Sequence, residues 1–141
     1  MRKVLQSDVA TTSTSYSDVT GLSFPVTSGR TYHFRFTIDY TVNATTIGTA
    51  WSINGPASPT RLSYSTQKTS STSANTILNG STSYGADTVN TDSAATGANL
   101  AIIEGIITPS ADGTVVARFL VETTGTLTAK AGSIVNWFEV K

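Results

Sequence analysis

The chain has 141 residues, a formal net charge of zero and no cysteine. This length suits one compact domain, residues 1–141, with its own hydrophobic core. The lack of cysteine excludes disulfides and thiolate metal sites, and the sparse, scattered charges, 13% of residues, exclude a cationic groove for nucleic acid. No apolar run reaches the about 18 residues of a transmembrane helix, so no membrane partner is expected.

The N-terminal segment, residues 1–15, is interpreted as a docking arm, because chain termini are mobile unless they are tied down. Leu5 and Val9 are its candidate interface residues. Short, weakly patterned strands are expected between glycine and proline turns in the first half of the chain. They cover residues 5–9, 16–19, 48–53 and 61–65.

The clearest element is a strand over residues 31–42. Aromatic and β-branched side chains alternate there with polar ones, which predicts one buried and one polar face. The buried set is Tyr32, Phe34, Phe36, Ile38, Tyr40 and Val42.

Residues 67–99 are dominated by Ser, Thr, Asn, Ala, Gly and Asp. A structureless loop of this length is uncommon in a compact domain. Two interpretations stay open: a weak strand near residues 75–79, or a long Ser/Thr-rich protrusion that packs on a neighbouring subunit.

Two further strands are predicted over residues 100–107 and 113–122, and the Pro and Asp-Gly signals between them predict a β-hairpin. The second strand carries apolar residues on both faces, which indicates burial on both sides or a subunit contact. Val116, Arg118 and Leu120 are therefore candidate interface residues.

The last predicted strand covers residues 134–140, and its Trp137 is expected to pack in the core or between subunits. Many short strands with Gly/Pro turns, and no predicted helix, indicate an all-β sandwich or barrel.

No catalytic site is predicted. The lone histidine, His33, supports neither a triad nor a zinc site, and no phosphate-binding, dinucleotide or calcium-loop motif is present. No metal or cofactor is therefore expected. A carboxylate pair for hydrolysis would need Glu104 and Glu122, placed on adjacent predicted strands, to approach each other; pairing of these acids with Arg118 or Arg35 is the preferred interpretation.

Five segments in order, between about residues 7 and 140, resemble a domain of tailed-bacteriophage structural proteins. They are VTGLSFPV (19–26), GRTYHFRF (29–36), NGP (54–56), NLAIIEG (99–105) and AGSIVNW (131–137).

This resemblance implies a jelly-roll-like antiparallel β-sandwich with little or no helix, located on the virion. It implies a homotrimer and a structural role, with no catalytic residues to carry over. The leading hypothesis is a capsid decoration (cement) protein that binds the major capsid protein at the capsid surface. The alternative is a tail-fibre or tail-tip module that binds a host receptor or glycan, with Trp51 and residues 67–99 as contacts.

Overall fold

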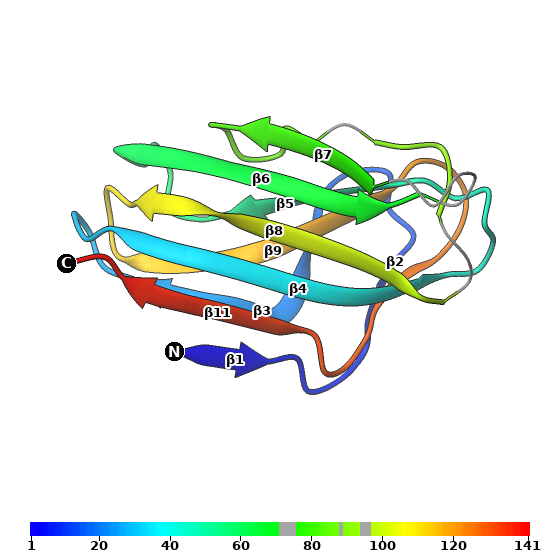
Figure 1. Cartoon of the computed structure of the whole chain (residues 1–141), viewed down its shortest axis with the longest axis horizontal. Helices are drawn as coiled ribbons and strands as arrows, with labels where there is room; N and C mark the ends of the chain where they lie inside the picture. The colour runs from blue at the N-terminus through cyan, green and yellow to red at the C-terminus, as the bar shows by residue number, and fades with distance from the viewer. Residues whose placement is uncertain (71–75, 88, 94–96) are drawn as a thin grey trace.

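The computed structural model describes residues 1–70, 76–87, 89–93 and 97–141, and every regular element in these ranges is a β-strand (Figure 1). The strands are β1 (Arg2–Val4), β2 (Val9–Thr11), β3 (Ser17–Val26), β4 (Tyr32–Val42), β5 (Thr49–Asn54), β6 (Arg61–Thr69), β7 (Thr76–Ser81), β8 (Asn99–Thr108), β9 (Gly113–Val121), β10 (Leu127–Ala129) and β11 (Ile134–Glu139).

Two antiparallel sheets face each other. The larger, sheet A, has the order β1-β11-β4-β8-β6-β7, with β10 pairing β4 and β2 at one end. The smaller, sheet B, has the order β3-β9-β5 and lies behind it in Figure 1. The expected all-β antiparallel sandwich is confirmed.

Successive strands cross repeatedly between the sheets: β3 lies in sheet B, β4 in sheet A, β5 in sheet B and β6 in sheet A. Such winding is typical of jelly-roll sandwiches.

The predicted hairpin between residues 100–107 and 113–122 is wrong, because β8 pairs with β4 and β6 whereas β9 pairs with β3 and β5. The Pro109–Gly113 turn carries the chain from one sheet to the other instead of folding it back within one.

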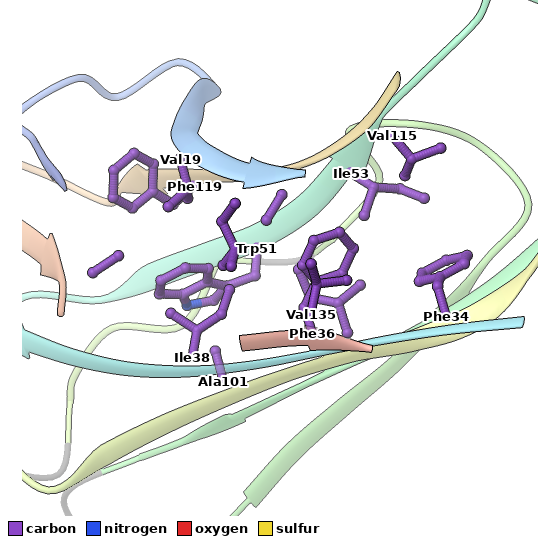
Figure 2. Close-up of a cluster of buried hydrophobic side chains, with 14 of the residues drawn as sticks. Val19, Phe34, Phe36, Ile38, Trp51, Ile53, Ala101, Val115, Phe119 and Val135 are labelled. Atoms are coloured by element: carbon purple, nitrogen blue, oxygen red, sulfur yellow. The ribbon is translucent and has the colours of Figure 1, made fainter. Parts of the chain in front are cut away.

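Strand β4 follows its predicted alternation, with every second residue buried from Tyr32 to Val42. Its Phe34 ring lies 5.7 Å from the ring of Phe24 on β3, measured between centroids, and Trp137 of the neighbouring β11 lies 5.4 Å from the same ring. Farther along the core, Trp51 of β5 packs between the sheets with Phe119 (Figure 2). One continuous core therefore fills the sandwich.

The N-terminal segment is part of sheet A. β1 pairs with β11, β2 pairs with β10, and the Met1 ammonium donates to the Trp137 carbonyl at 2.9 Å. The predicted strand over residues 5–9 is wrong, because the chain turns there between β1 and β2, and Leu5 inserts into the core, 3% exposed.

Within the long polar segment, the weak strand exists as β7, which pairs with β6. Asn75, part of that prediction, lies outside the described residues. The residues that follow, 82–87 and 89–93, fold back along the open edge of β5. The backbone N–H of Thr49 donates to Asn90 Oδ1 at 2.7 Å, and that of Trp51 donates to Asp87 Oδ2 at 2.8 Å. Side chains of this segment thus satisfy edge donors that would otherwise accept an added strand.

Candidate functional site

The outer face of sheet B carries part of the predicted interface. Val116, Arg118 and Leu120 all point outward from β9, the central strand, and all are half-buried. Arg118 is held by an ion pair in which its Nε lies 2.7 Å from Asp18 Oδ1 on β3. This face is thus mixed in character, with one paired charge between two aliphatic side chains.

A shallow groove of about 370 Å³ opens on the same face. It forms because the β3–β9 register breaks between Asp18 and Ser23, where Val19 and Leu22 both turn into the core and Gly21 adopts φ +97°. The groove residues are Asp18, Thr20, Gly21, Ser23, Asn54, Thr114 and Val116. A second hollow, of about 460 Å³, is lined by threonines, Asn43 and Gly125 and contains no ionisable side chain.

The other predicted interface residues point inward. Trp137 is 8% exposed and stacks on Phe24, and Leu5 is 3% exposed, so both are core residues. Val9 is half-buried against the same core.

Trp51, Tyr64 and Tyr84 do not form an aromatic platform on which a sugar could stack. Trp51 is fully buried and its indole Nε1 donates to Thr49 Oγ1 at 3.0 Å. Tyr64 is buried and bonds the Ser83 carbonyl at 2.6 Å, while the Tyr84 hydroxyl bonds the Pro56 carbonyl at 3.0 Å. Trp51 is therefore wrong as a glycan contact, because no face of its ring reaches the surface.

The hypothetical carboxylate pair is also wrong. Glu104 lies on the outer face of sheet A, 3.5 Å from Arg35 Nη1 and 3.7 Å from His33 Nε2. Glu122 follows β9 in the other sheet and accepts from the backbone N–H of Gly48.

Among the described residues, no group of three or more His, Cys, Asp or Glu side chains is placed to hold a metal ion. Within these same residues no helix has the length and apolarity to cross a membrane.

The one deeply buried ionic contact among the described residues was missed by sequence reasoning. Lys68 Nζ lies 2.8 Å from Asp87 Oδ2, and the two side chains are 1% and 0% exposed. Burial lowers the pKa of Lys68 and the adjacent carboxylate opposes this shift. The sequence pattern that could have predicted this contact is the alternation in β6. Leu62, Tyr64 and Thr66 face inward, and Lys68 is the next residue with the same orientation.

The carboxylate of Asp87 has further partners. It accepts from Thr66 Oγ1 at 2.8 Å and from Asn79 Nδ2 at 2.7 Å, besides the Trp51 N–H. These donors come from β5, β6 and β7, so the residue joins both sheets to the segment after β7. A carboxylate so fully bonded is a structural tie rather than a reactive group.

The outer face of sheet A holds the larger exposed apolar surface. Phe138 is 55% exposed, Leu100 is 40% exposed and Leu78 is 65% exposed. The His33 ring stacks on Phe138 with centroids 5.1 Å apart, which explains why a histidine sits on this face without a catalytic partner.

No protein-family model matches the chain, and no curated protein sequence matches it. Solved structures that resemble it weakly include infectious bursal disease virus, Gx strain, at 9% identity and a TM-score of 0.29, covering 97% of this chain. The virus's VP2 subviral particle gives 12% identity and a TM-score of 0.28, covering 99% of this chain. The chain spans about two fifths of the length of those proteins, 37% and 40% respectively.

Proposed function

We propose that this protein is a virion structural protein, and that it serves as a capsid decoration protein bound to the major capsid protein of a bacteriophage shell. The proposal rests on the ordered resemblance to tailed-phage structural domains. The single structural observation that supports it is that most charged side chains make ion pairs or hydrogen bonds within the sandwich, which leaves few unpaired charges on its outer faces.

The pairing of charges is extensive. Besides the buried Lys68–Asp87 contact, Arg30 Nη1 lies 3.0 Å from Glu139 Oε2, and Asp8 pairs with Lys130. Acids and bases held in this way provide neither a free general base nor a cation cluster. A protein of this kind is suited to binding by shape and area.

The segments that carry the resemblance also form the scaffold. NGP (54–56) ends β5, NLAIIEG (99–105) is most of β8, and AGSIVNW (131–137) contains the turn into β11. Gly132 in that turn adopts φ +94°, which an L side chain rarely adopts. The resemblance is therefore one of fold, consistent with a structural role.

For the capsid contact we propose the outer face of sheet B around Val116, Arg118 and Leu120. It is a small, rigid surface, because β9 is paired on both sides. Its aliphatic side chains flank a charge already neutralised by Asp18, so docking would not strip water from an unpaired ion.

The experiment is co-sedimentation of the purified protein with undecorated capsids, together with the melting temperature of the shell. We expect saturable binding and a higher melting temperature. Leu120→Lys should abolish binding, because it places an unpaired charge within the contact, while Thr124→Lys, at an exposed loop position, should bind normally. Failure of the wild-type protein to bind capsids would overturn the proposal. Equal binding by both variants would overturn the assigned face.

A further inference from the structure

The outer face of sheet A has a pattern that complements itself. Six strands lie side by side in the order β1-β11-β4-β8-β6-β7, so the midline of the sheet runs between β4 and β8. Their registers define straight rows of outward side chains across the sheet.

The middle row is Arg2, Asn136, Arg35, Glu104, Ser65 and Gly80. Both cations lie on one side of the midline, and the anion lies directly beyond it. The next row is Val4, Ile134, Thr37, Ile102, Gln67 and Leu78. Its two ends are aliphatic, and Leu78 is 65% exposed.

We infer that this face binds a second copy of the chain, through a two-fold axis that lies in the contact plane, parallel to the strands, along the β4–β8 midline. The operation sets β4 of one copy over β8 of the other and β1 over β7. Because a two-fold contact is reciprocal, each pairing occurs twice.

Rows stay at the same level under this operation. Arg35 and Glu104, which form an ion pair of 3.5 Å within each copy, then face Glu104 and Arg35 of the other copy, so the two ion pairs make a network of four alternating charges. Val4 faces Leu78. In the row on the opposite side of the middle row, exposed Phe138 faces Ser63, a small residue that leaves room for the ring. Opposite charges and apolar ends therefore meet in these rows, while Asp39 faces Leu100 near the end of β8.

The alternative face-to-face symmetry gives the opposite result. A two-fold axis perpendicular to the strands at the middle row sets Arg35 over Arg35 and Glu104 over Glu104. Like charges placed together in this way oppose association. The charge pattern thus selects one of the two symmetric arrangements.

The area of the contact is that of a small interface. Strands lie about 4.8 Å apart and rise about 3.3 Å per residue, and the registers set 9 residues of β4 over β8, 6 of β11 over β6 and 3 of β1 over β7, each twice, which covers roughly 570 Å². A standard protein interface buries about 800 Å² on each partner. Centring the axis on the β4–β8 midline also gives the greatest overlap of the two sheets.

The test begins with the molar mass in solution, by light scattering over a dilution series. We expect about twice the 14.7 kDa of one chain. A monomer at all concentrations would overturn the inference, and so would the trimer that the phage resemblance implies.

Two charge reversals then identify the face. Arg35→Glu makes positions 35 and 104 both acidic, and Glu104→Arg makes both basic, so each variant alone should be monomeric, with Kd raised roughly tenfold or more. Mixing the two variants should restore a dimer, because every facing pair is then of opposite charge. Arg118→Glu, on the outer face of sheet B, is the matched control and should remain dimeric.

Circular dichroism of each variant verifies that it is folded. Dimers that persist in either single variant, or a mixture that stays monomeric, would overturn the inference. Capsid binding is measured separately and is not part of this test, so its failure would leave the two-fold contact standing.

Discussion

Lys68 and Asp87 form an ion pair between the two sheets, with Nζ 2.8 Å from Oδ2 and both side chains withdrawn from solvent. Lys68 comes from β6 of sheet A, and Asp87 comes from the segment that runs along β5 of sheet B. The contact therefore joins β6 of sheet A to the β5 edge of sheet B.

Asp87→Asn should be strongly destabilising. The amide keeps the size of the carboxylate but removes its charge, and its NH₂ group must face either the Lys68 ammonium or one of the other donors. Breaking a buried pair by removing one partner costs about 3–5 kcal/mol. Urea unfolding monitored by tryptophan fluorescence measures the loss of free energy of unfolding.

The matched control is Asp18→Asn. Asp18 also pairs with a cation, Arg118 at 2.7 Å, but its side chain is 47% exposed. Exposed pairs contribute roughly 0–1 kcal/mol, so this variant should unfold nearly like the wild type. Equal losses in the two variants would contradict a structural role for the buried pair.

Gly48→Ala should displace the segment that covers β5. A Cβ atom at Gly48 would lie 1.5 Å from the backbone O of Asn90 and 2.8 Å from Glu122 Oε2. Overpacking of this kind costs about 1–3 kcal/mol. Hydrogen exchange should then accelerate at the N–H groups of Thr49 and Trp51, whose acceptors are side chains of that segment.

Gly80→Ala provides the comparison. Its Cβ would meet nothing within 4 Å, and the change lowers the entropy of the unfolded chain. We expect a gain of about 0.4–1 kcal/mol with unchanged exchange at β5. Accelerated exchange in this variant would mean that the segment is loosened by any added methyl group nearby.

Phe24→Ala tests whether the aromatic cluster is the central part of the core. Its ring is fully buried and lies 5.4 Å from Trp137 and 6.0 Å from Phe36. Such truncations cost about 3–5 kcal/mol. Val140→Ala, at a site 45% exposed, should change the unfolding midpoint little; a similar loss there would contradict the assignment of the core.

Alternating patterns predicted the strands that are buried on one face only. β4 and β11 begin and end within a residue of their predicted bounds because period-2 alternation records which side chains face the core. Trp137 could not be assigned to core or interface, since an apolar face looks the same whether it packs on its own chain or another.

Pairing partners were not predictable by the same means. The turn after β8 has the residues of a hairpin, yet nothing in its sequence distinguishes a return within one sheet from a crossing to the other. The Lys68–Asp87 contact depended on this topology, because it joins β6 of sheet A to the segment that runs along β5 of sheet B. The outward rows of sheet A likewise require the order of six strands, which only the structure supplies.

The last prediction concerns alkaline pH. Burial is the main cause that raises the pKa of Tyr16, Tyr40 and Tyr84 above the ordinary value of 10.0. Above pH 10 the unfolded chain therefore loses these protons while the folded chain retains them, so the unfolded state binds fewer protons. The stability that these groups provide is complete below pH 10 and falls as the pH rises through their folded-state pKa values.

Tyr16→Phe isolates one of these contributions. Lys68, whose pKa is lowered, changes stability in the opposite direction, but it is present in both proteins and cancels from the comparison. The free energy of unfolding should fall less steeply above pH 10 in the variant than in the wild type, and tyrosinate absorbance in the wild type should rise together with unfolding. Parallel curves for the two proteins above pH 10, or tyrosinate that forms fully before unfolding, would contradict the burial of this hydroxyl.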